Sequence, residues 1–244
     1  LIIDRKTGKI IVPHERGYIE FDSSIQGPHD YRHVGRGLLA RNLKLPTGDY
    51  TASLLHAVYC DPAIKDEPES QVIKAIMKTQ NAELLVFNRV LWTSEGVYVL
   101  PDFRAVGTRE SLNVKSLEKR LKGSIEVKGV RFSRDGCVRF APEESFLGGN
   151  QGFLDDSEHL SEDGFVIASY GLEGAEKLEE VSANFPKNPR TFGVSVSPAY
   201  SPDLNVSSLF INSCKQLFVD GAVHDDSEAD GFASESGYAF GILK

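Results

Sequence analysis

Two histidines near the start of the chain have a spacing that could bind a metal ion. His29 and His33 are four residues apart, so on a helix their imidazole rings would share one face. His56 and Cys60 have the same spacing, and imidazole nitrogen and thiolate sulfur are both ligands that zinc accepts. Neither pair encloses the glutamate of a zinc-protease motif, and a core-facing His56 is the alternative interpretation. The pattern predicts a divalent-metal site that includes His29 and His33.

An acidic segment near the end of the chain provides a second candidate metal site. Asp226, Glu228 and Asp230 alternate along the sequence and are followed by Gly231, as in the opening of a calcium-binding loop. Carboxylate oxygens at alternate positions can surround a divalent cation. The twelfth position of such a loop is Gly237, where a glutamate normally completes the ligand set. The alternative is a solvated acidic loop, and no cofactor other than a divalent metal is predicted.

Basic residues cluster in the segment 29–44 and suggest anion binding. Arg32, Arg36 and Arg41 would lie on the polar side of a helix in this segment. Guanidinium groups bind carboxylates and phosphates with two parallel hydrogen bonds, so the expected partner is an anion or an acidic protein surface. The acidic second half of the same chain is the alternative partner.

The chain contains no complete catalytic motif. It lacks a nucleophile elbow, a phosphate-binding P-loop and the zinc-deaminase signature. The main functional hypothesis is therefore a domain that binds a small molecule or a protein. One alternative is a metal-dependent hydrolase that uses the histidines and carboxylates above. The other is an assembly subunit that joins oppositely charged halves head to tail. Whether the chain is an enzyme stays open.

Composition restricts the partners and the compartment. The 244 residues are 41% hydrophobic and carry a formal net charge of −8, which disfavours nucleic acid and anionic membranes as partners. No apolar run is long enough to span a membrane, and the first residues lack the apolar core of a secretion signal. The three cysteines are widely spaced, which indicates free thiols. We expect an acidic, soluble, cytoplasmic protein.

Charge and secondary-structure pattern both change along the chain. Residues 1–123 carry 18 basic and 15 acidic residues, whereas 124–244 carry 9 and 20. Four helices are expected in the first part, over 29–43, 51–60, a segment that starts at Asp66, and 114–121. Only one helix, over 174–185, is expected in the second part. The third helix should face the core with Val72, Ile73, Ile76 and Met77.

Strand patterns dominate the rest of the chain and define the predicted fold. The expected strands are 2–4, 9–12, 18–21, 83–92, 97–100, 125–132, 137–140, 165–170, 192–197, 206–211, 216–219 and 238–243. Early helices and late strands predict an α+β fold with helices, mainly from the first half, packed on a mixed, mostly antiparallel sheet. We predict one domain over 1–244, with a subdivision near 123–163 between the helix-rich part and the acidic, strand-rich part.

Overall fold

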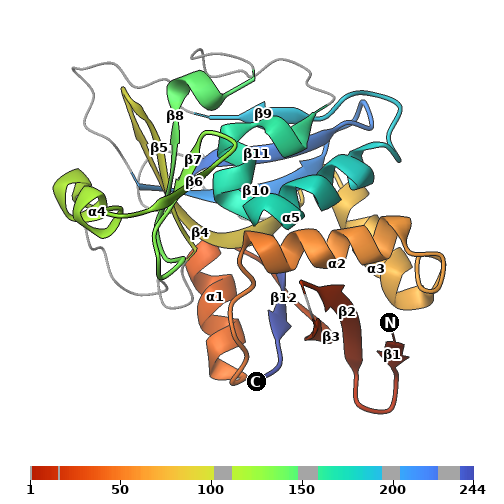
Figure 1. Cartoon of the computed structure of the whole chain (residues 1–244). Coiled ribbons are helices and arrows are strands. Elements are labelled where there is room, and N and C mark those ends of the chain that lie inside the picture. Colours follow the sequence, from red (N-terminus) through yellow and green to blue (C-terminus); the bar gives the residue numbers. More distant parts are fainter. Residues whose placement is uncertain (1, 16, 102–111, 148–158, 194–203, 225–236) are drawn as a thin grey trace.

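The computed structural model of the chain describes residues 2–15, 17–101, 112–147, 159–193, 204–224 and 237–244. Helices and strands are mixed along the chain (Figure 1). The α-helices are α1 (Tyr31–Ala40), α2 (Gly48–Cys60), α3 (Pro68–Lys78), α4 (Val114–Arg120) and α5 (Gly164–Ser182). The strands are β1 (Ile2–Asp4), β2 (Lys9–His14), β3 (Gly17–His29), β4 (Glu83–Thr93), β5 (Gly96–Pro101), β6 (Ile125–Val127), β7 (Val130–Phe132), β8 (Arg139–Pro142), β9 (Arg190–Phe192), β10 (Leu204–Ile211), β11 (Leu217–His224) and β12 (Gly237–Ile242).

The described strands form one mixed sheet, which confirms the predicted α+β class. Its main path runs β1-β2-β3-β12-β4-β5-β8-β7-β6, and β10 branches from β4 and continues to β11 and β9. Among the described pairs, only β12 with β4 and β11 with β9 are parallel. Four of the five described helices come from the first half, as predicted. None of the described helices has the length and apolar character needed to cross a bilayer.

Helices α2 and α5 pack side by side across the sheet and hold most of the core (Figure 1). Leu54, Leu55 and Val58 of α2 are buried, in agreement with the predicted apolar face of this helix. The two helices approach closely because small residues meet where they touch. A side chain added at Gly174 would place its Cβ 3.4 Å from the Cβ of Ala52.

The segment predicted as a strand over 165–170 is the first part of helix α5, so that prediction was wrong. Every residue from Phe165 to Tyr170 is buried, and a continuous apolar run is compatible with a buried strand or a buried helix. Asp163 decides between them, because its carboxylate accepts a hydrogen bond from the Val166 amide and caps the helix. The helix is interrupted at Gly171, where φ is 73°.

Helix α3 was predicted correctly except for its cap and one face. Its N-cap is Glu67 rather than Asp66, and neither side chain makes a capping hydrogen bond in the described structure. Ile73 and Met77 are buried as expected, whereas Val72 is 52% exposed. The apolar stripe is therefore narrower than predicted, and the opposite side of α3 is polar.

Strands from the two halves of the chain are neighbours in the sheet, and we propose that they fold as one domain. Trp92 of β4 is the single tryptophan, and its indole nitrogen donates a hydrogen bond to the Gly221 carbonyl at 2.8 Å. Its ring also lies 5.1 Å from that of Phe165. Trp92 fluorescence therefore reports contacts between the halves. We predict that fluorescence and far-ultraviolet circular dichroism give one coincident urea transition. Two separated transitions would contradict a single domain.

The capping carboxyl of α5 also predicts a dependence of stability on pH. Asp163 is 1% exposed, and burial raises its pKa from 3.8 to about 6, although backbone amides of Val166, Leu147 and Phe165 oppose the rise. Between these values the folded carboxyl binds more protons than the unfolded one. The free energy of unfolding therefore falls as the pH rises through this window, by about 3 kcal/mol in total.

An Asp163→Asn variant should lose this pH dependence, because asparagine can still cap a helix but does not ionise. We expect the difference in unfolding free energy between wild type and variant to change by about 2 kcal/mol between pH 4 and pH 7, because part of the total effect falls below pH 4. Urea denaturation at several pH values measures it. Glu126→Gln, on the exposed strand β6, is the charge-matched control. A difference that stays constant across the range would refute the role assigned to Asp163.

Candidate functional site

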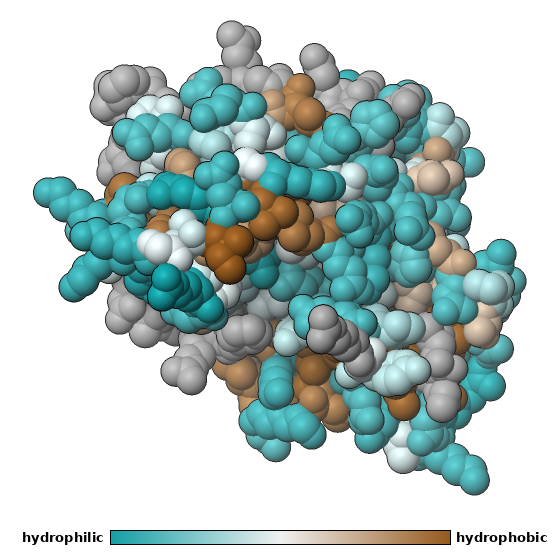
Figure 2. Space-filling view, in the orientation of Figure 1, coloured by the Kyte–Doolittle hydropathy of each residue, from teal (hydrophilic) through white to brown (hydrophobic). Residues whose placement is uncertain are grey.

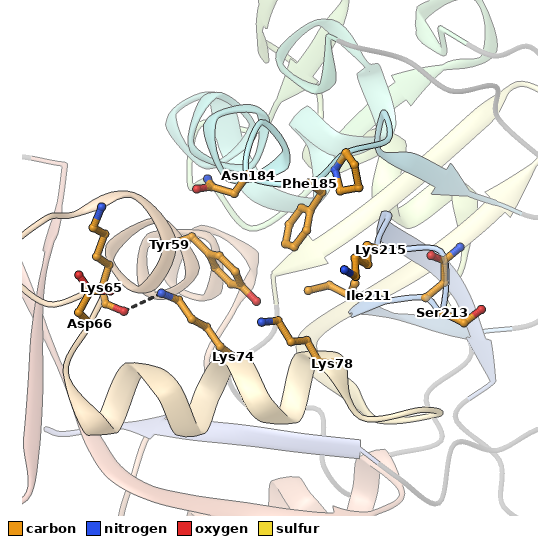
Figure 3. Close-up of a pocket in the computed structure, with 12 residues that line it drawn as sticks. Tyr59, Lys65, Asp66, Lys74, Lys78, Asn184, Phe185, Ile211, Ser213 and Lys215 are labelled. Atoms are coloured by element: carbon orange, nitrogen blue, oxygen red, sulfur yellow. Dashed lines mark hydrogen bonds between the residues drawn. The ribbon is translucent and has the colours of Figure 1, made fainter.

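A pocket of about 590 Å³ opens where α2, α3, α5 and the β10–β11 turn meet, and we call it the lysine pocket (Figure 3). Its volume is in the range of small-molecule sites. It is lined by Tyr59, Lys65, Asp66, Lys74, Lys78, Asn184, Phe185, Pro186, Ile211, Asn212, Ser213 and Lys215. Helix α3 supplies two lysines four residues apart, which places both on the polar side of that helix.

The lysine pocket carries an unbalanced positive charge. Lys65, Lys74, Lys78 and Lys215 line it together with one carboxylate, that of Asp66. Among the described residues, none of the four lysines forms an ion pair within 4.0 Å. Four cations around one cavity, in a protein with a net charge of −8, define a site that favours an anion.

One wall of the lysine pocket is aromatic. The rings of Tyr59 and Phe185 meet edge to face, with centroids 5.4 Å apart and an angle of 63° between them. Pro186 and Ile211 extend this apolar surface (Figure 3). A flat apolar group could therefore lie against this wall while a charged group meets the lysines.

The Tyr59 hydroxyl is the least satisfied polar atom of the site. Tyr59 is 8% exposed, and its hydroxyl has no hydrogen-bond partner among the described residues. Burial raises the pKa of Tyr59, so the group stays a neutral hydroxyl that can donate or accept. In Figure 3 it is directed toward the Lys78 ammonium rather than away from the pocket. A buried hydroxyl in this state is an available contact for a ligand.

Lys74 is held against the aromatic wall. Its ammonium lies 5.3 Å from the centre of the Tyr59 ring and donates a hydrogen bond to the Lys65 carbonyl at 2.6 Å. Burial lowers the pKa of Lys74, and the neighbouring charges of Lys78 and Lys65 add to this, whereas Asp66 opposes it. Shifted pKa values of this origin are common in functional sites.

A second, smaller cleft of about 290 Å³ lies at the interruption of α5, but its charges are paired. The Arg139 guanidinium makes two hydrogen bonds to the Asp49 carboxylate, at 3.1 and 2.8 Å. Lys177 pairs with Glu173 at 2.6 Å and also donates to the Ser53 hydroxyl. The Arg139–Asp49 ion pair connects β8 to α2, and the Lys177–Ser53 hydrogen bond connects α5 to α2, so we interpret this cleft as structural.

The structure describes the histidines of the predicted metal site but not its carboxylates. His29 is the last residue of strand β3, and His33 lies in the first turn of α1. The prediction that the two histidines share one helix face was therefore wrong. Their rings are 5.9 Å apart, and the His33 ring bonds to Asp30. His56 bonds to Glu180 at 2.7 Å. In the part of the chain that the structure describes, no group of three or more metal-ligating residues is present.

Asp226, Glu228 and Asp230 lie outside the described residues, so the calcium loop stays a prediction. The predicted anion site on α1 also remains untested. Arg41 pairs with Asp22 at 2.9 Å, whereas Arg36 is exposed. The predicted free thiols are confirmed, because Cys60, Cys137 and Cys214 are unpaired.

Comparisons with known proteins do not assign the chain to a family. No family model matches it, and no curated protein matches it. One solved structure is similar, described as "Accommodation of massive sequence variation in Nanoarchaeota by the C-type lectin fold". It shares 11% identity over 88% of this chain and 94% of that chain, with a TM-score of 0.41. A TM-score below 0.5 leaves the function to be argued from the residues of this chain.

The unpaired hydroxyl predicts an unusual response to mutation. Tyr59→Phe should raise the free energy of unfolding by about 1 kcal/mol, because it removes a buried polar atom that lacks a partner. Tyr98→Phe is the matched control, since the Tyr98 hydroxyl donates to Glu118 at 2.7 Å. That variant should lose about 1 kcal/mol. Urea denaturation measures both, and equal losses in the two variants would show that Tyr59 already has a partner.

Proposed function

We propose that this chain is a binding domain whose ligand is a small organic anion with a flat apolar body, held in the lysine pocket. The observation that carries the proposal is the set of four lysines without ion-pair partners around a cavity with an aromatic wall. Charged groups that fold without partners favour a ligand that neutralises them.

The two chemical parts of the lysine pocket suggest how the ligand would be oriented. Lys78 and Lys215 are exposed and would meet an anionic group such as a phosphate or a carboxylate. The ring of Phe185 would contact the flat part of the ligand, and the Tyr59 hydroxyl would accept or donate one hydrogen bond. Binding in this way needs no catalytic motif, which is consistent with the absence of one from the sequence.

The other functions considered from the sequence have less support from the described residues. A metal-dependent hydrolase requires a ligand set that the described histidines do not form. For location we propose the cytoplasm, which is supported by the three free cysteines.

Phenyl phosphate is a minimal probe that combines a flat ring with an anion. We expect it to bind the full chain in isothermal titration calorimetry, more weakly as sodium chloride is raised. The double variant Lys78→Gln, Lys215→Gln should bind at least about tenfold more weakly, which corresponds to about 1.4 kcal/mol.

The control for this titration is the double variant Lys119→Gln, Lys122→Gln, which removes the same charge from exposed positions on and just after α4. It should bind phenyl phosphate like the wild type. If both double variants lost affinity equally, the effect would come from net charge and the pocket would not be the site. An absence of binding by the wild type to phenyl phosphate would contradict the proposed function.

A further inference from the structure

Lys65 and Lys74 are more closely surrounded by the protein than the other two lysines of the lysine pocket, and only Lys74 among the described lysines lies over the Tyr59 ring. The Lys74 side chain is partly buried, whereas Lys78 and Lys215 are exposed. The amine lies over the face of the Tyr59 ring at 5.3 Å from its centre (Figure 3). It is therefore the lysine that a ligand against the aromatic wall would meet first.

The surroundings of Lys74 favour the neutral amine more than water does. Burial is the largest contribution to the lowered pKa of this group, and the like charges of Lys78 and Lys65 act in the same direction. Asp66 and the Cys60 thiol oppose them. Lysines that are desolvated beside other cations act as nucleophiles toward carbonyl compounds, because the neutral amine has a free electron pair.

The geometry leaves that electron pair available. Lys74 donates a hydrogen bond to the Lys65 carbonyl, and a neutral amine keeps this bond with one of its two N–H groups. The hydrogen bond limits the rotation of the amine and keeps it at the pocket wall. The Tyr59 hydroxyl, which has no partner among the described residues, offers a proton donor within the same pocket.

We propose that Lys74 forms a reversible imine with an aldehyde or ketone group of the anionic ligand. The neutral amine attacks the carbonyl carbon, a carbon–nitrogen bond forms, and the carbonyl oxygen leaves as water with the two protons of the amine. No oxidant or reductant is needed. This inference rests on the proposed function, since Lys78 and Lys215 must hold the anionic group while the carbonyl meets Lys74.

Pyridoxal 5′-phosphate tests the inference, because it combines a flat ring, a phosphate and an aldehyde. The full chain is incubated with a substoichiometric amount, the imine is reduced with borohydride, and the modified lysine is mapped by peptide mass spectrometry. We expect Lys74 to carry several-fold more label than any other lysine, and visible absorbance of the imine to appear before reduction. Label spread evenly over the lysines would overturn the inference.

Two variants separate reaction from binding. Lys74→Arg keeps the positive charge but removes the nucleophile, so it should lose the imine absorbance and still bind pyridoxine 5′-phosphate, which has an alcohol in place of the aldehyde. Lys119→Arg, at an exposed position of α4 outside the pocket, keeps both the charge and the Lys74 amine, and should still form the imine. Unchanged labelling of the Lys74→Arg variant would show that another amine reacts.

Pyridoxine 5′-phosphate also distinguishes this inference from the proposed function. If the wild type binds this alcohol in calorimetry but forms no imine with the aldehyde, the anion pocket stands and the role of Lys74 is refuted. If neither compound binds, the proposed function fails together with the inference. Excess pyridoxine 5′-phosphate should reduce labelling of Lys74 and leave the label on exposed lysines such as Lys119 unchanged.

Discussion

The pairing of strand β4 with strands from both halves of the chain is the constraint on which the rest of the structure depends. It pairs with β10 along one edge, and with β5 and β12 along the other. Side chains of β4 are buried on both faces. Leu84, Val86 and Trp92 face the core cluster of α2 and α5, while Leu85 and Phe87 face that of α1. A strand covered on both sides needs helices on both sides of the sheet.

The lysine pocket follows from this arrangement. The buried Asn88 of β4 donates a hydrogen bond to the Ser169 carbonyl of α5 at 2.6 Å and accepts one from the Gly48 amide at the start of α2. The Asn88 side chain therefore connects the start of α2 to the first part of α5. Both helices then run across the sheet, so that Tyr59, near the end of α2, meets Phe185, just beyond α5. Helix α3 buries one face against the same core, which leaves its lysines toward these rings (Figure 3).

Local patterns were sufficient to predict most elements but not the site. Helix α3 could be recognised from the spacing of Ile73 and Met77, because that spacing records which face is buried. The segment 165–170 could not be assigned, since burial on all sides removes the periodicity that separates helix from strand. The pocket could not be predicted, because Tyr59, Lys74 and Phe185 are brought together only by tertiary packing. The one feature of the sequence that points to the pocket is the pair of lysines four residues apart on α3. The face drawn in Figure 2 is largely hydrophilic, with smaller apolar regions between the polar ones.

The charges that line the lysine pocket are consistent with the anionic ligand proposed above. Arginines such as Arg41, Arg131 and Arg139 fold beside a carboxylate partner. At the lysine pocket the chain instead brings four ammonium groups together with one carboxylate, and like charges that are apart in the unfolded chain repel one another in the folded state. An anion that binds only the folded chain removes this repulsion, and its binding free energy adds to the free energy of unfolding. If the proposed anion binds there, its affinity and the stability of the fold are linked through the same four side chains.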